Sequence, residues 1–453
     1  MNPLISKYNV AGPRYTSYPT VPFWQTDMFD ERAWLSSLAS TFRQSNTTTG
    51  ISLYIHLPYC ESLCTFCGCN KRITKNHEVE DPYIQAVLKE WQLYLNQFSE
   101  KPRIAEIHLG GGTPSFFKPQ MLEILISGIL KYADLAYEIE FSFEGHPNNT
   151  SYQHLATLYE LGFRRVSFGV QDYDPMVQKA IHRIQPFENV KQVTEWSRKI
   201  GYQSISHDLV YGLPFQKTAS ISDTVAKTLE LQPDRLAFYS YAHVPWLKGN
   251  GQRGFKDEDL PSAELKRELY ETGRTLFEKN GYSEIGMDHF ALPQDSLYKA
   301  MQGGTLNRNF MGYTTTQTKV LLGLGVSSIS DSWTGFSQNT KNIDEYINLL
   351  KNNQLPISKG HILTDEDIKM RQQILNIMCQ LSTTWQHDDF SDEENVILYE
   401  KLDGFKQDGL LSFTDNSLIV NPEGKPFIRN ICMAFDKRML REQLSGQLFS
   451  QTV

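Results

Sequence analysis

The sequence has no long hydrophobic run and no excess of basic charge. No stretch approaches the roughly 18 consecutive apolar residues of a membrane-spanning helix, and residues 1–8 lack the apolar core of a signal peptide. The formal net charge is −8, which argues against a nucleic-acid-binding protein with a broad basic surface. We therefore expect a cytoplasmic protein that has no membrane span and no nucleic-acid partner.

Cysteine is scarce and unevenly placed. The 453 residues include six cysteines, and four of them, Cys60, Cys64, Cys67 and Cys69, lie within ten positions. Thiols stay reduced in the cytosol, so these four are predicted to bind metal and not to form disulfides. The other two, Cys379 and Cys432, stand alone in helix-like apolar stretches, where we expect them to serve in packing.

The spacing Cys-x3-Cys-x2-Cys-x-Cys favours an iron–sulfur cluster over zinc. Structural zinc usually takes two separated cysteine pairs, whereas thiolates in one loop can wrap a cuboidal cluster. Cys69 is only two positions from Cys67 and sterically awkward as a further ligand of the same cluster. If Cys60, Cys64 and Cys67 alone bind, one iron stays open for a substrate or cofactor, which is the arrangement of an enzyme.

Strand-like and helix-like segments alternate from residue 51 onwards. The predicted strands cover 52–57, 104–109, 137–144, 165–170, 204–211 and 235–242, and helical patterns lie between them near 81–98, 119–132, 151–161, 186–200 and 220–231. This alternation predicts an α/β fold with a parallel sheet. Polar or glycine residues follow every strand, which favours a barrel with its site at the carboxyl ends. Six strands predict a partial, open (β/α)6 barrel of the TIM type.

Three domains are expected. Residues 1–50 form an N-terminal arm that covers the active site. Residues 51–335 form the partial barrel with an extension, including a helix at 262–280 and a further strand at 282–290. Residues 336–453 form a mostly helical, winged-helix-like domain, with helices at 342–351, 364–381, 395–408 and 422–440 and two short strands within 409–421. Because the chain is acidic, a lid or structural role suits this last domain better than nucleic-acid binding.

The motifs resemble those of a known family. Three cysteines after a first strand and Gly-Gly-Gly-Thr-Pro (110–114) after a second are similar to the radical S-adenosylmethionine (SAM) superfamily. More narrowly, the chain resembles the oxygen-independent coproporphyrinogen III oxidases. This resemblance runs through residues 14–20 (RYTSYPT), 67–71, 169–172, 208–214, 241–243, 286–290, 309–315 and 428–433.

The resemblance implies a set of binding residues. Cys60, Cys64 and Cys67 would hold a [4Fe–4S] cluster whose open iron chelates SAM. Residues matching the family's first SAM site are Tyr54, Gly111 and Glu144, with Ile329 nearby. Those matching a second SAM molecule are Phe66, Gly112, Thr113, Gln171, Arg183, Asp208 and Ala242.

The resemblance also implies the reaction. A 5′-deoxyadenosyl radical from SAM would act on two propionate side chains of coproporphyrinogen III, which lose CO2 and become vinyl groups in protoporphyrinogen IX. The implied partners are this substrate and a cytosolic electron donor such as flavodoxin or ferredoxin, and the chain would act as a monomer. Two positions stand out: Met311 occupies a place where the family commonly has glutamine, and Cys69 matches a family cysteine that is not a ligand.

Two alternatives stay open. Non-catalytic haem chaperones of the same superfamily resemble the barrel, but they lack the arm at 14–20 and have an aromatic residue where Cys69 stands. Another radical SAM reaction on a tetrapyrrole, such as methyl transfer with ring opening, is the second. Decarboxylation of coproporphyrinogen III would separate the oxidase from both.

Overall fold

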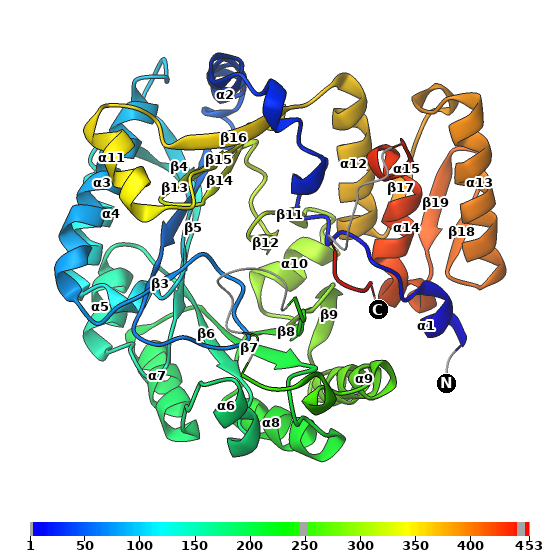
Figure 1. The fold of residues 1–453 in the computed structure, drawn as a ribbon, viewed down its shortest axis with the longest axis horizontal. Coiled ribbons are helices and arrows are strands. Elements are labelled where there is room, and N and C mark those ends of the chain that lie inside the picture. Colours follow the sequence, from blue (N-terminus) through cyan, green and yellow to red (C-terminus); the bar gives the residue numbers. More distant parts are fainter. Residues whose placement is uncertain (1–2, 245–251, 253, 442–448, 453) are drawn as a thin grey trace.

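A 12-stranded sheet organises the computed structural model, which describes residues 3–244, 252, 254–441 and 449–452 (Figure 1). Its central strands, from β13 through β1 and on to β8, all run parallel. Along the sheet the order is β16 (Ile357–Ile362), β15 (Gly335–Asn339), β14 (Ile329–Asp331), β13 (Val320–Leu324), β1 (Ile51–Leu57), β4 (Arg103–Gly111), β5 (Asp134–Gly145), β6 (Arg165–Gln171), β7 (Ser204–Tyr211), β8 (Arg235–Ser240), β10 (His289–Ala291) and β9 (Ser283–Gly286). The six predicted parallel strands and the predicted α/β class are therefore confirmed.

Helices cover the outer face of the curled sheet, as Figure 1 shows. They are α3 (Glu80–Leu95), α4 (Pro119–Leu130), α5 (Tyr152–Glu160), α6 (Pro175–Ala180), α7 (Phe187–Ile200), α8 (Thr218–Glu230) and α9 (Ala263–Lys279). In α3 the buried Tyr83, Val87, Trp91 and Tyr94 recur every three or four residues and form one face. The short α6 was not predicted; it begins where the Asp174 carboxylate accepts the Met176 backbone N–H at 2.7 Å.

Strand β1 separates the outer core from the barrel interior. Ile51, Leu53, Ile55 and Leu57 are fully buried in the core that includes α3. Burying each such side chain contributes about 1.5–3 kcal/mol. Successive side chains of a strand point to opposite faces, so the alternate position Tyr54 faces the interior. This alternation turns the polar side chains of β1 toward the barrel interior, where Ser52 contacts Glu106.

The sheet extends antiparallel at both edges. At one edge, the single strand expected at 282–290 is wrong: β9 and β10 form a hairpin there, because the chain turns at Asp288 with a φ of +68°. At the other edge, β14, β15 and β16 continue the sheet beyond β13. The boundary expected after residue 335 thus falls at the first residues of β15, and the sheet continues to Ile362. Helix α11 (Ile343–Lys351) lies between β15 and β16 in sequence and packs on α3.

The remaining C-terminal segment is mostly helical, as expected. It consists of α12 (Asp365–Gln380), β17 (Ser382–Thr384), α13 (Asp392–Gln407), β18 (Leu411–Phe413), β19 (Ser417–Val420), α14 (Ile428–Ala434) and α15 (Lys437–Arg441). The three strands form a separate antiparallel sheet in the order β17-β19-β18.

The single helix expected at 422–440 is wrong. A 3-10 helix (Pro422–Phe427) precedes α14, and α15 begins after a break. The break occurs because the Asp436 carboxylate accepts the Met439 N–H at 2.9 Å and so caps a new helix.

The N-terminal arm joins the C-terminal segment to the sheet. Its helix α1 (Pro3–Tyr8) lies beside that segment in Figure 1, and α2 (Glu31–Ser45) contacts β15 and β16. Between them, Tyr15 enters the C-terminal core and Arg14 pairs with Asp288. The Arg429 guanidinium donates to the backbone carbonyls of Gly12 and Pro13. The arm is therefore held both by the β9–β10 hairpin, through Asp288, and by the C-terminal segment.

Three smaller elements complete the fold. Helix α10 (Ser296–Gln302) follows β10, and the hairpin β11 (Asn307–Asn309) and β12 (Gly312–Thr314) precedes β13. Among the described helices, none combines the length and the apolar character needed to cross a membrane.

Candidate active site

The cysteine loop begins where β1 ends. Strand β2 (Tyr59–Cys60) pairs in parallel with β3 (Arg72–Ile73), so the loop between them folds back on itself. The Thr74 N–H donates to the Cys60 carbonyl at 2.9 Å, and the Arg72 N–H donates to the Pro58 carbonyl at 2.8 Å. Inside the loop, the Lys71 ammonium donates to the Cys67 carbonyl at 3.0 Å. Backbone hydrogen bonds therefore position the loop that carries the four thiols.

The loop opens on a cavity of about 470 Å³ at the carboxyl ends of the strands, a size typical of small-molecule sites. Most of the predicted site residues line it. They are Cys60, Cys64, Phe66, Cys67, Gly111, Gly112, Thr113, Glu144, Gln171, Arg183 and Asp208. The fold thus brings together side chains from positions 60 to 208.

Three predicted residues lie elsewhere. Tyr54 stands behind the cavity wall, where its hydroxyl is 3.1 Å from His56 Nδ1. Ala242 follows β8, and the Gln252 amide bridges its carbonyl and that of Phe66 at 3.0 and 3.1 Å. Ile329 packs in an apolar cluster with Trp24 and Phe336 on the other side of β13.

The thiols differ in their surroundings. Cys60 Sγ lies 3.2 Å from the Thr113 hydroxyl, and burial raises the pKa of Cys60 to about 11. The Cys69 thiol hydrogen-bonds to Cys67, which lowers the pKa of Cys67 and raises that of Cys69. Arg183 approaches Cys64 Sγ at 3.8 Å. Among the residues that the structure describes, no three His, Cys, Asp or Glu side chains are arranged to hold a metal ion.

Charged groups surround the thiols. Burial raises the pKa of Asp208 to about 7, and its carboxylate accepts the Ser167 hydroxyl at 2.7 Å. Arg183 donates to the Gly169 carbonyl at 2.6 Å, while its buried Nε has no hydrogen-bond partner within the described residues. Burial, reinforced by Arg183, lowers the pKa of His146 to about 2, so this imidazole is neutral. A guanidinium with an unused donor can bind a carboxylate through its planar fork.

Glycine is required where β4 meets the loop. The Gly112 N–H donates to the Leu57 carbonyl at 2.8 Å, and the Thr113 N–H donates to the Tyr59 carbonyl at 3.0 Å. A Cβ on Gly112 would lie only 2.6 Å from the carbonyl carbon of Pro58. The end of β4 therefore approaches the cysteine loop more closely than any other residue type allows.

Sequence reasoning missed several cavity-lining residues, notably Lys71, Lys75, His146 and Ile184. One signal was available for the lysines: residues 71–75 read Lys-Arg-Ile-Thr-Lys, which places three cations immediately after the cysteines. His146 directly follows β5 and could have been found by the strand-end argument. No comparable signal marked Ile184.

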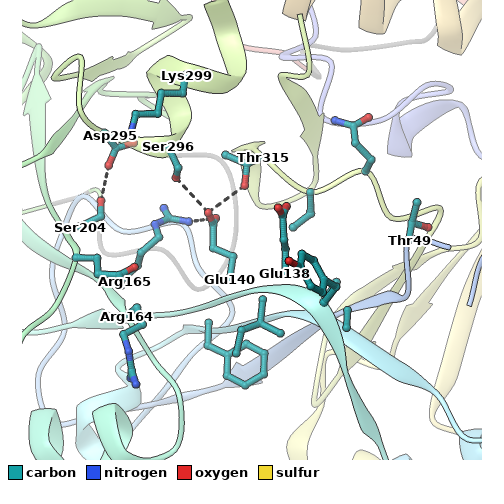
Figure 2. Close-up of a pocket in the computed structure, with 18 of the residues that line it drawn as sticks. Thr49, Glu138, Glu140, Arg164, Arg165, Ser204, Asp295, Ser296, Lys299 and Thr315 are labelled. Carbon is teal, nitrogen blue, oxygen red and sulfur yellow. Dashed lines mark hydrogen bonds and ion pairs between the residues drawn. The ribbon is translucent and has the colours of Figure 1, made fainter. Parts of the chain in front are cut away.

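A second cavity of about 620 Å³ lies at the opposite end of the barrel, where the strands begin (Figure 2). Glu140 pairs there with Arg165 and accepts the Thr315 hydroxyl at 3.0 Å. The Ser204 hydroxyl donates to Asp295 at 2.7 Å. None of its described lining residues is a predicted site residue. These polar contacts line the amino-terminal end of the barrel, whereas the predicted site residues gather at the cysteine end.

Comparisons with known proteins point to one family. Residues 54–227 match the model of the radical SAM superfamily. The oxygen-independent coproporphyrinogen III oxidase of Helicobacter pylori (strain J99) is 38% identical over 439 residues, covering 95% of each chain. That of Escherichia coli K12 is 36% identical over 458 residues, covering 99% of this chain and 98% of the relative.

A solved structure is similar over nearly the whole fold. The E. coli coproporphyrinogen III oxidase, described as a radical SAM enzyme, superposes with a TM-score of 0.87 at 34% identity and covers 94% of this chain and 97% of its own. Identity above 30% over almost the full length of both chains leaves one assignment. The chain belongs to the family of oxygen-independent coproporphyrinogen III oxidases, within the radical SAM superfamily.

Proposed function

We propose that this protein converts coproporphyrinogen III into protoporphyrinogen IX without O2, by oxidative decarboxylation of two propionate side chains to vinyl groups. One observation carries the proposal. The three thiols expected to hold a cluster share a single cavity with polar residues from the ends of four consecutive strands, β4 to β7, in a chain similar to these oxidases along its whole length.

The residues present fit the cofactors of such an enzyme. Cys60, Cys64 and Cys67 would hold a [4Fe–4S] cluster through their thiolates. Support comes from the free thiols on one cavity wall and from Thr113, which can hydrogen-bond to Cys60. When bound, the cluster and SAM supply the 5′-deoxyadenosyl radical that removes a hydrogen atom from the substrate.

We further propose two SAM molecules. The first would lie against Gly111 and Glu144, with Tyr54 behind them and Ile329 beyond. The second would contact Phe66, Gly112, Thr113, Gln171, Arg183, Asp208 and Ala242. The cavity-lining positions support these assignments, whereas Tyr54, Ala242 and Ile329 rest on the family resemblance.

Side chains that line the cavity can bind and orient the charged groups of a ligand. Glu144, whose side chain is 47% exposed, can accept an ammonium group. Arg183 offers its unused Nε to a carboxylate. Gly112 has no side chain, so it adds little bulk to the wall of the cavity. The apolar Phe66 helps to exclude water from a reactive intermediate.

The decisive experiment is anaerobic turnover. The protein with its reconstituted cluster is incubated with a reductant, SAM and coproporphyrinogen III, and protoporphyrinogen IX and 5′-deoxyadenosine are quantified. We expect both products. Stable haem binding without decarboxylation would instead identify a haem chaperone. A flavodoxin or ferredoxin as donor and a monomeric enzyme are further parts of the proposal, to be checked by replacing the chemical reductant and by sedimentation.

The ligand assignment has its own test. Cys64→Ala should abolish cluster absorbance and SAM cleavage, because a cluster with two protein ligands is not retained. Cys379→Ala is the matched control, since Cys379 lies in α12, outside the cavity. Retained cleavage in Cys64→Ala would refute the assignment of that ligand.

A further inference from the structure

Strand β3 is exposed to solvent, and one backbone hydrogen bond links the residue that follows it, Thr74, to Cys60, a proposed cluster ligand. In the β2–β3 ladder, Ile73 is the partner of Cys60. Both residues of β3, Arg72 and Ile73, are exposed, and within the described residues this sheet has only two strands, so no further described strand pairs with the outer edge of β3. Adjacent strands lie about 4.8 Å apart. The exposed strand is therefore the nearest neighbour of the Cys60 strand on that side.

The surface around β3 is basic and partly apolar. Residues 71–75 carry three cations and no acid, in a chain with 52 acidic and 44 basic residues. Lys341 adds a further exposed cation close by, because its carbonyl accepts the Asn70 amide at 3.2 Å. One apolar side chain of the same segment is also exposed, that of Ile73, at 42%.

One acid pairs directly with β3. Arg72 pairs with Asp344 at 3.1 Å, but their side chains are 51% and 80% exposed. Such exposed pairs are worth at most about 1 kcal/mol and exchange readily for another partner. A basic rim around an apolar side chain is complementary to an acidic protein surface, and this complementarity raises association rates and fixes orientation.

We propose that β3, with the cation of Arg72 and that of the neighbouring Lys341, is the docking surface for an acidic one-electron carrier protein. The inference rests on the proposed function, because it assumes the cluster at Cys60, Cys64 and Cys67. One electron leaves the carrier, which is oxidised by one unit, and enters the cluster, which is reduced by one unit. The path runs from β3 through the Thr74 N–H to the Cys60 carbonyl and its thiolate.

The test combines binding with electron transfer. Flavodoxin, an acidic flavin carrier, is titrated into the cluster-containing protein by calorimetry, and cluster reduction by its hydroquinone form is followed by stopped-flow absorbance. The variant is Arg72→Glu with Ile73→Asp; both side chains point to solvent, and neither lines the cavity. We expect the Kd to rise and the second-order reduction rate to fall, each about tenfold or more at low salt. Wild-type binding should weaken as salt is added.

Controls separate docking from catalysis. Dithionite needs no docking surface, so dithionite-driven formation of 5′-deoxyadenosine should be unchanged in the variant. The matched charge reversal is Lys227→Glu, an exposed lysine on α8, which should behave as wild type with flavodoxin.

Two outcomes would overturn the docking proposal, and a third would refute the proposed function. Unchanged flavodoxin affinity and reduction rate in the double variant would overturn the proposal. A raised KM for coproporphyrinogen III, with flavodoxin binding intact, would assign this surface to the substrate's carboxylates and also overturn it. Wild-type protein that makes no product even with dithionite would refute the proposed function instead.

Discussion

Gly112→Ala should damage the reaction far more than it damages the fold. The added Cβ would lie 2.6 Å from the carbonyl carbon and 2.7 Å from the carbonyl oxygen of Pro58, whereas ordinary contacts begin at 3.4 Å. Both clashing atoms belong to backbone, so no side chain can swing away. The loop must therefore retreat by about 1 Å, at a typical overpacking cost of about 1–3 kcal/mol.

This displacement of the cysteine loop acts directly on the candidate active site. Gly112 and Thr113 donate to the Leu57 and Tyr59 carbonyls, immediately before Cys60. A misplacement of about 1 Å in a catalytic arrangement can reduce the rate about 100-fold. We expect a loss of that order in the rate of SAM cleavage, measured as 5′-deoxyadenosine with dithionite as reductant, and a small change in the urea midpoint.

Gly128→Ala is the matched control. Its Cβ would meet Leu88 Cδ2 at 2.7 Å, a similar approach, but the contact is with the end of a flexible side chain between α3 and α4. We expect this variant to cleave SAM at the wild-type rate. Equal cleavage rates in the two variants would refute the argument that the backbone contact at Gly112 positions the cysteine loop.

Two further predictions concern stability. Glu90 is fully buried, and burial raises its pKa from 4.5 to about 7. Its contribution to the free energy of unfolding is therefore complete below pH 4.5 and is lost as the pH rises through 7. Glu90→Gln cannot ionise, and urea unfolding between about pH 5 and 8 should show a flatter decline than wild type; an unchanged slope would contradict the raised pKa. Arg371 of α12 pairs with Asp331 of β14, and both side chains are 8% exposed. Arg371→Met should lower the free energy of unfolding by about 3–5 kcal/mol. The control Arg274→Met breaks more exposed pairs and should lower it by under about 1 kcal/mol. Similar losses in both variants would show that burial of the Arg371–Asp331 pair does not matter.

Local patterns were sufficient for much of the fold. The parallel strands and their helices are long and periodic, so their apolar residues mark them without reference to the rest of the chain. The proposed ligand set also rests on local sequence, because Cys60, Cys64 and Cys67 lie in one short segment whose spacing suits an iron–sulfur cluster.

Features that depend on distant partners were not accessible in this way. Strand β3 is two residues long and exposed to solvent, and its only described strand partner is β2. Arg183 reaches Cys64 across 119 sequence positions, and nothing in the local sequence around either residue predicts that contact. Only the family resemblance pointed to Arg183.

Two interruptions that the sequence analysis did not predict, in the strand at 282–290 and in the helix at 422–440, have local causes in the sequence. Asp288 between β9 and β10 and Asp436 before α15 both interrupt apolar runs. Aspartate is a favoured turn and N-cap residue. The antiparallel extension from β14 to β16 is different, because its short strands show no distinctive periodicity and are recruited by the edge of β13.

The contact between Arg429 and the carbonyls of Gly12 and Pro13 sets an order of events during synthesis. A ribosome adds about 5–20 residues per second, so the arm leaves the exit tunnel roughly 20–80 s before its guanidinium partner has been made. The barrel strands and the cysteine loop emerge within that interval. Arg14 can pair with Asp288 earlier, but the carbonyls of Gly12 and Pro13 gain their guanidinium partner only when the last helices are made.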